Sequence, residues 1–139
     1  MSDTEPAGAS GPDPEVIELA TQVFDLARRG ESDRLAAYLD AGVPVNLTND
    51  KGDTLVMLAA YHGHDRATAL LCERGADIDR LNDRGQSPLA GAVFKGEDTV
   101  VDILADHGAD PGAGTPSALE AARMFDKPHY LRRFTTEHD

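Results

Sequence analysis

The chain has 139 residues, of which 25 are acidic and 13 are basic, so its formal net charge is −12. This excess of acid argues against unspecific binding to nucleic acid or to an anionic membrane surface, because both attract cations, and it leaves a basic partner open. The single cysteine, Cys72, has no second cysteine for an internal disulfide, and the sequence shows neither a signal peptide nor an apolar run of the roughly 20 residues that span a membrane, so a cytoplasmic protein is expected.

The first predicted elements are a polar tail and a pair of helices. Residues 1–12 are small, polar and free of basic side chains, which predicts a disordered acidic tail, either an inert leader or a recruitment segment. Asp13 and Pro14 are typical of a helix start and Gly30 of its end, and a shorter helix ending near Gly42 should follow. Apolar residues at helical spacing predict the buried faces of both helices: Val16, Leu19, Ala20, Val23, Phe24 and Ala27 in the first, and Leu35, Tyr38 and Leu39 in the second.

The next stretch indicates that the chain is built from repeats. Residues 51–83 and 84–116 match at an offset of 33 positions. Such a period, with glycines at fixed places, predicts a solenoid made of one supersecondary unit. The matched positions are Gly52 and Gly85, Thr54 and Ser87, Gly63 and Gly96, Gly75 and Gly108, and, one period earlier, Thr21 and Thr54, Gly30 and Gly63, Gly42 and Gly75, and Asn49 and Asn82.

Each unit is predicted to hold a helix, a turn and a second helix. Thr54 and Ser87 are natural N-caps for the first helix, and Cys72 falls in an apolar slot of the second helix, where we expect it to fill the core. Ser117 opens a last unit about three residues early, and its polar outer face suits a C-terminal cap. The expected architecture is therefore all-α, with four helix–turn–helix units joined by short hairpin-like loops, at about 13–50, 51–83, 84–116 and 117–139, the first and last being caps.

These features resemble the ankyrin repeat, which has a period of 33 residues and the signature T-P-L-H-x-A. The signature stands here as TLVMLA at 54–59 and as SPLAGA at 87–92. The Gly-His that opens the second helix of the family is Gly63-His64, and the Gly-Ala-Asp that closes it occurs at 75–77 and 108–110. The resemblance covers roughly residues 18–139 and implies a small stand-alone array, similar to bacterial ankyrin repeat proteins.

The sequence departs from the family pattern at the signature itself. Met57 and Ala90 stand where the family has His, so the hydrogen bonds that this His makes should be missing. Gly91 replaces a helix-forming leucine, which costs about 1 kcal/mol in intrinsic helix propensity. These departures predict an array of moderate stability.

No set of residues predicts catalysis. His62 and His64 are two positions apart, whereas helical neighbours that share a metal are four apart. There is no Gly-x-Ser-x-Gly elbow, and the glycine-rich stretch 108–114 lacks the Gly-Lys-Ser/Thr ending of a phosphate-binding loop. We therefore expect no enzymatic activity, no cofactor and no bound metal.

The resemblance implies that another protein binds the concave face, formed by the hairpin tips and the exposed ends of the first helices. The helix-end positions hold basic and aromatic residues and no acid, although acids outnumber bases in the chain nearly two to one. Aromatic and Arg side chains supply many binding hot spots, so this row predicts a basic–aromatic stripe for a partner segment with acidic and apolar residues. The candidates are Arg28, Arg29, Tyr61, His62, Phe94, Lys95, Met124 and Phe125 at the helix ends, and Asp50, Lys51, Asp53, Asp83, Arg84 and Gln86 at the hairpin tips.

Two alternatives stay open for this row and for the function. The row can also be ordinary exposed helix ends, with Met124 or Phe125 closing the core of the cap. The first function is a monomeric adaptor or regulator that binds a protein through the concave face. The second is an acidic inhibitor or mimic that masks a basic protein surface. Binding by charge should weaken steeply with ionic strength, whereas an aromatic-anchored interface should weaken modestly.

Overall fold

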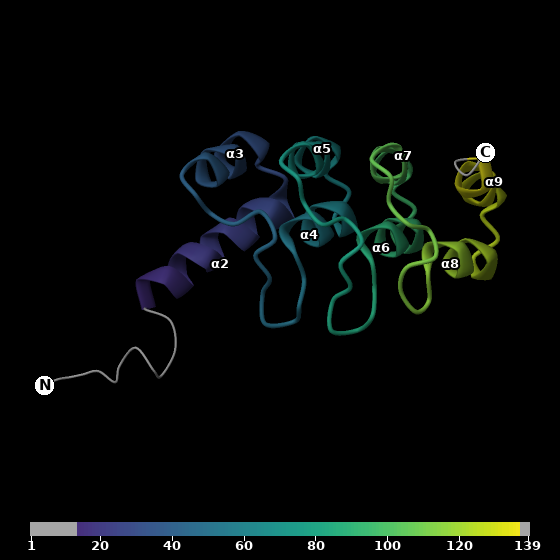
Figure 1. The fold of residues 1–139 in the computed structure, drawn as a ribbon, viewed down its shortest axis with the longest axis horizontal. Helices are drawn as coiled ribbons and strands as arrows, with labels where there is room; N and C mark the ends of the chain where they lie inside the picture. Colours follow the sequence, from purple (N-terminus) through teal and green to yellow (C-terminus); the bar gives the residue numbers. More distant parts are fainter. Residues whose placement is uncertain (1–13, 137–139) are drawn as a thin grey trace, which may run out of the picture.

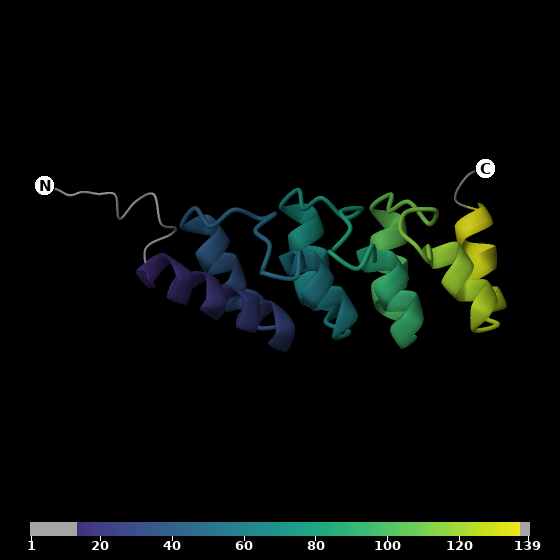
Figure 2. The same cartoon turned by 90° about the horizontal axis from the view of Figure 1, so that it is seen from below.

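The computed structural model describes residues 14–136, which form helices and connecting loops and contain no strand. Two rows of helices run side by side, α2, α4, α6 and α8 in one and α3, α5, α7 and α9 in the other (Figure 1), and the loops between units project from one side (Figures 1 and 2). The expected all-α solenoid is confirmed, whereas the tail at 1–12 and the cap Asp13 lie outside the described residues. The helix bounds are α2 Pro14–Arg29, α3 Ser32–Asp40, α4 Leu55–Tyr61, α5 Asp65–Glu73, α6 Pro88–Lys95, α7 Asp98–Asp106, α8 Ala118–Met124 and α9 Pro128–Thr136.

Side-chain caps start the first helices of the units, as the sequence predicts. The hydroxyl of Thr54 accepts a hydrogen bond from the amide of Met57 at 3.1 Å, and that of Ser87 accepts from Ala90 at 3.0 Å. Ser117 forms a reciprocal capping box with Glu120. Each cap satisfies amide groups that have no partner inside the helix, which fixes where the helix begins.

The core lies between the two rows of helices. Every residue of α4 from Leu55 to Ala60 is buried, and α6 is buried from Pro88 to Val93, because each of these helices has neighbours on three sides. The outer helices bury only one face, as α7 does with Val101 and Leu104. Cys72 is partly buried against this core, and burial raises the pKa of its thiol to about 11, so at neutral pH it is an unreactive, protonated filler.

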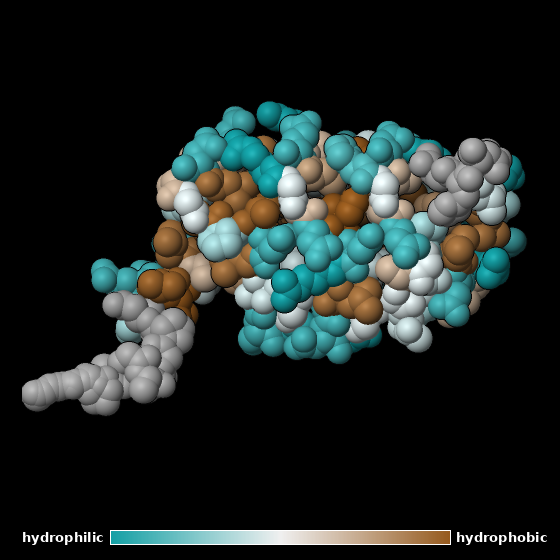
Figure 3. All heavy atoms as spheres, in the orientation of Figure 1, coloured by the Kyte–Doolittle hydropathy of each residue, from teal (hydrophilic) through white to brown (hydrophobic). Residues whose placement is uncertain are grey.

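The first helix differs from the prediction. Val16 and Leu19 were expected to be buried, yet they are 55% and 39% exposed, and Ile17 beside them is 51% exposed. The reason is length: α2 has 16 residues and α4, against which it packs, has seven, so the first turns of α2 extend past their neighbour. Figure 3 shows the resulting hydrophobic area at the start of α2. Thr21 lies inside this helix, where its hydroxyl donates to the Ile17 carbonyl at 2.9 Å, and therefore caps nothing.

Adjacent hairpins are joined directly through their backbones. The amide of Asp83 donates to the carbonyl of Lys51 at 3.0 Å, and the amide of Thr115 donates to that of Gly85 at 2.9 Å. Within the second hairpin, the side chain of Asn82 is buried. Its oxygen accepts from two amides of the tip, and its nitrogen donates to the Asp53 carboxylate of the first hairpin at 2.8 Å. These bonds hold the hairpins at a fixed spacing along one side of the array.

Side chains also tie neighbouring units together on the helical side. The His64 ring covers Gly30, where a Cβ atom would lie 2.5 Å from the ring, and its Nε2 is 2.5 Å from the carbonyl oxygen of Arg28. On the outer helices, Arg74 pairs with Asp40 of the previous unit at 2.6 Å. Both contacts cross from one unit to the next, which is how a solenoid, in which each unit contacts only its neighbours, keeps its register.

Candidate functional site

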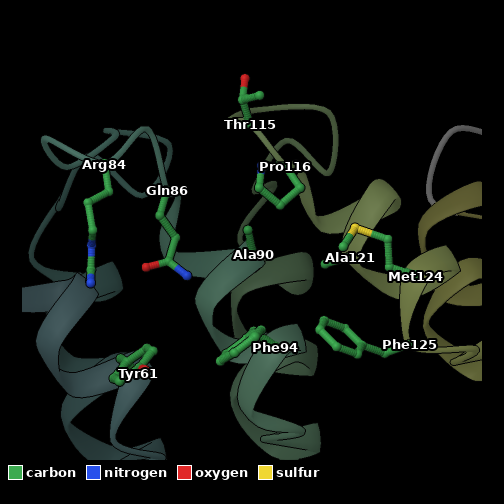
Figure 4. Close-up of a pocket in the computed structure, with 10 residues that line it drawn as sticks. All are labelled: Tyr61, Arg84, Gln86, Ala90, Phe94, Thr115, Pro116, Ala121, Met124 and Phe125. Atoms are coloured by element: carbon green, nitrogen blue, oxygen red, sulfur yellow. The ribbon is translucent and has the colours of Figure 1, made fainter.

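A hollow of about 380 Å³ opens between the first helices α4, α6 and α8 and the hairpins beside them. Tyr61, Phe94 and Phe125 project from the C-terminal ends of these helices, and Arg84 and Gln86 reach in from the second hairpin (Figure 4). Ala90 and Ala121 form the bottom of this hollow, and their small side chains leave the space above them open. We call this space the apolar hollow, and define it by Tyr61, Ala90, Phe94, Ala121, Met124 and Phe125.

The walls of the apolar hollow are large apolar side chains that the core leaves uncovered. Phe94 is 54% exposed, Met124 67% and Phe125 43%. The rings of Phe94 and Phe125 meet edge to face, with centroids 5.4 Å apart and planes at 71°. This pairing holds both rings in place, so the hollow has a preformed aromatic wall. Neither Met124 nor Phe125 closes the core of the last unit.

A second hollow, of about 400 Å³, adjoins the first and shares Tyr61 and Arg84 with it. We call it the basic hollow, and define it by Arg28, Lys51, Tyr61, His62 and Arg84. A third hollow, beside Ile17 and Phe24 on α2, shares Arg28 with the basic hollow. The three spaces form one groove that runs past all four first helices along the hairpin side of the array.

The electrostatics of the groove differ between its parts. Lys95 places its Nζ 4.7 Å from the centroid of the Tyr61 ring, which is a cation–π contact. Desolvation, followed by the nearby charge of Lys95, lowers the pKa of His62, so this ring is neutral at pH 7. Arg28 pairs with Asp25 of its own helix at 2.7 Å. The fixed positive charge near the middle of the groove therefore comes from Arg and Lys side chains.

The structure gathers most of the predicted binding residues and separates a few. Six of them line the apolar hollow or its rim: Tyr61, Arg84, Gln86, Phe94, Met124 and Phe125. The basic hollow adds Arg28, Asp50, Lys51, Asp53 and His62. Arg29, Asp83 and Lys95 line neither hollow: Arg29 pairs with Glu31 at 3.4 Å, and Lys95 lies over Tyr61.

Asp53 is less accessible than the other candidates of the hairpins. It is only 7% exposed and its carboxylate accepts from the side chain of Asn82. The turn folds back at this point, because the amide of Asp53 itself donates to the side chain of Asn49. Asp53 is therefore a structural part of the groove floor.

Sequence reasoning missed the small and irregular residues of the site. Ala90 and Ala121 make the hollow possible, and Pro116 closes it from the loop before α8. The signal for Ala90 was present, since it stands where the family signature has a larger His. No periodic signal marks Pro116, because the loop that carries it is the shortened one.

Residues 14–136 hold no cluster of three or more His, Cys, Asp or Glu side chains placed to bind a metal ion. None of their helices is both long enough and apolar enough to cross a membrane.

Stacked helix pairs with hairpins along one side define a helical-repeat solenoid. The family model for ankyrin repeats, which describes three copies of the repeat, matches residues 23–115, which is more than half of the chain. This chain therefore belongs to the ankyrin repeat family. Ankyrin repeats are generally protein–protein interaction modules and are typically not catalytic.

Two known proteins show the extent of the likeness. An ankyrin repeat protein of Pseudomonas aeruginosa is 58% identical over 52 residues, which are 37% of this chain and 30% of that protein. The crystal structure of the human ASB11 ankyrin repeat domain superposes with a TM-score of 0.61 and 27% identity, covering 64% of this chain and 40% of that one. The chain thus spans less than half the length of either relative.

Proposed function

We propose that this protein is a non-catalytic adaptor or regulator, acting as a monomer in the cytoplasm, that binds a partner protein through the groove. The observation that carries the proposal is the convergence of Phe94, Met124 and Phe125, all large, apolar and exposed, in one hollow. The other large apolar side chains that are exposed among the described residues are Val16, Ile17 and Leu19 on α2 and Leu81 on the second hairpin. Exposed aromatic clusters of this kind are typical of partner sites.

The preformed wall supports the same proposal. Phe94 and Phe125 already hold each other in an edge-to-face pair, so a partner need not immobilise either ring on binding. Preorganised side chains retain more of the interaction free energy, because less conformational entropy is lost. The backbone hydrogen bonds donated by Asp83 and Thr115 join the second hairpin to the loops on both sides of it. They hold Arg84 and Gln86, which this hairpin carries, in place beside the two rings.

The acidic-mask alternative finds less support. Several acids of the outer helices already pair with arginines across unit boundaries. These pairs are Arg66 with Asp33, Arg74 with Asp40, and Arg133 with Asp102 and Asp106. Carboxylates that are partly neutralised within the chain offer a weaker field to a basic partner.

Affinity capture from cells that express the protein separates the two functions. The baits are the wild type, the double variant Tyr61→Ala/Phe94→Ala and the control Leu81→Ala, which removes a similarly exposed apolar side chain outside the groove. We expect one prey to be lost with the double variant, retained by the control and retained at moderate salt. A prey that the double variant keeps and salt releases would instead establish the acidic mask. Circular dichroism checks that each bait is folded.

A further inference from the structure

We infer that the groove takes an extended peptide segment with two parts: an apolar anchor in the apolar hollow and, about five residues away, acidic side chains in the basic hollow. The inference rests on the proposed function and adds the chemistry and the order of the bound segment. It follows from the different linings of the two hollows, from two cations of the basic hollow that form no ion pair among the described residues, and from the span of the apolar hollow between α4 and α8.

The apolar hollow fits one or two large apolar side chains. Its aromatic walls, Phe94 and Phe125, stand on α6 and α8, and its floor is two alanine methyl groups. A volume of about 380 Å³ exceeds that of a single side chain, and burying a leucine or phenylalanine there removes apolar area of both partners from water. Arg84 is the one charged side chain that lines this hollow, so a charged side chain placed against the two aromatic rings, away from Arg84, would lose its hydration without gaining a partner.

The basic hollow is selective for carboxylates. Within residues 14–136, Lys51 and Arg84 form no ion pair with any carboxylate, although the chain as a whole is strongly acidic. The hollow is lined by three bases, Arg28, Lys51 and Arg84, and by two acids, Asp50 and Asp53, so one formal positive charge remains in its lining. The Asp53 carboxylate is buried and accepts from Asn82, which leaves Asp50 as the exposed acid of this hollow. A partner carboxylate can therefore form charge-assisted hydrogen bonds with Arg84, in the fork geometry that guanidinium favours.

The position of Arg84 links the two hollows. Its side chain extends from the second hairpin toward the helix ends and borders both spaces (Figure 4). Neighbouring packed helices lie about 8–10 Å apart, so α4 and α8 are about 16–20 Å apart. An extended chain rises about 3.3 Å per residue and covers this distance in about five or six residues. A segment of this length therefore crosses the apolar hollow from Phe125 and reaches Arg84, where the basic hollow begins.

Selection from a phage-displayed dodecapeptide library tests the inference without assuming a partner. The full chain is the bait in four forms: wild type, Phe94→Ala, Arg84→Glu and Arg80→Glu. Arg80 is exposed and lines neither hollow, so Arg80→Glu makes the same change of net charge outside the groove. Fluorescence anisotropy then measures the affinity of the most enriched peptide, synthesised in acidic form and with its carboxylates replaced by amides.

The expected result is an enriched motif with an apolar residue and, about five positions away, Asp or Glu. Phe94→Ala and Arg84→Glu should each weaken binding at least about tenfold, as does the loss of a typical hot-spot residue. Amide replacement should weaken wild-type binding by a similar factor, while Arg80→Glu changes it by less than about twofold. If Phe94→Ala proves unfolded by circular dichroism, Met124→Ala takes its place, because Met124 is the most exposed side chain of the wall.

Other outcomes separate this inference from the proposal beneath it. Enriched peptides that lose affinity with Phe94→Ala, but contain no acids and ignore Arg84→Glu, would overturn the two-part segment and leave the groove as the binding site. Peptides that ignore Phe94→Ala and Met124→Ala, or no enrichment at all, would overturn both.

Discussion

Replacing Asn82 by alanine tests how the hairpin side of the array keeps its shape. The Asn82 side chain is 7% exposed and forms three hydrogen bonds. Its oxygen accepts from the amides of Arg84 and Gln86, both at 3.0 Å, and its nitrogen donates to the Asp53 carboxylate at 2.8 Å. Asn49 occupies the same position in the first hairpin, where it accepts from the amides of Lys51 and Asp53, both at 2.9 Å. The matched variant Asn49→Ala therefore removes the same local turn without the contact between hairpins.

The expected free energies of unfolding follow from this difference. A net contribution of about 1 kcal/mol for each amide bond predicts a loss of about 2 kcal/mol in Asn49→Ala. Asn82→Ala loses a comparable amount and also leaves the carboxylate of Asp53, itself 7% exposed, without its side-chain donor. Hydrogen bonds to charged groups contribute about 1.5–3 kcal/mol. The total for Asn82→Ala is therefore about 4 kcal/mol, a large fraction of the stability of a domain of this size.

Urea unfolding followed by circular dichroism measures both variants. With a slope of about 2 kcal/mol per molar urea, the midpoint should fall by about 1 M in Asn49→Ala and by about 2 M in Asn82→Ala. Asn82→Asp provides a further check, since it places two carboxylates together in a buried site. This proximity raises the pKa of one of them, so the variant should gain stability relative to wild type as the pH falls. Equal midpoints for the two alanine variants would refute the role of the bond to Asp53.

Three further predictions concern single sites. Thr68→Val should raise the free energy of unfolding by about 1 kcal/mol in urea titration, because the hydroxyl is buried and has no hydrogen-bond partner among the described residues; an unchanged or lower value would contradict this. Gly52→Ala should lower the urea midpoint more than Gly85→Ala. Both glycines have positive φ, 76° and 75°, which disfavours alanine by about 1–2 kcal/mol at either position. A Cβ on Gly52 would also lie 3.0 Å from the backbone of the next hairpin, whereas the atom nearest to a Cβ on Gly85 is 3.9 Å away. Equal shifts of the urea midpoint would show that the contact at Gly52 is unimportant. Tyr130→Phe should destabilise the chain at pH 7 and lose this effect as the pH falls below about 3.8. The hydrogen bond from Tyr130 lowers the pKa of Asp98 from 3.8, so its stabilising contribution is present above that value and lost as the carboxylate is protonated; a difference that does not change with pH in thermal melts would contradict the assignment.

The fold could be predicted because the same landmark residues recur along the sequence at a period of 33 residues. The helix caps Thr54 and Ser87 and the glycines between helices recur at one period, and local rules of capping and positive φ suffice to place each element. The first unit departs from the period. Thr21 matches Thr54 in spacing but lies inside α2, which begins at Pro14 as predicted. The helical spacing of apolar residues was wrong for Val16, which is 55% exposed.

The large residues that line the groove could be predicted from the sequence, whereas the depth of the groove could not. The aromatic side chains stand at repeat positions that the family resemblance marks as exposed, whereas the space between them depends on packing across units. Gly91 shows why: a Cβ there would lie 3.0 Å from the Met57 methyl group and 3.3 Å from the Tyr61 ring. Two of the three departures from the family pattern, Met57 and Gly91, thus lie against each other across neighbouring units, which is a relation that neither residue reveals alone.

The apolar hollow has one wall on the last helix pair of the described chain. Met124 is the last residue of α8 and Phe125 follows it. Within residues 14–136, α8 and α9 stack against a neighbouring helix pair on one side only. In a one-dimensional array, such a terminal unit opens more readily than the units inside it. A ligand that contacts both Phe94 and Phe125 therefore holds the last helix pair against its neighbour. Its affinity is thermodynamically linked to the local opening of α8 and α9. Occupancy of the groove should be readable far from the contact itself, as slower hydrogen exchange of the backbone amides of α9.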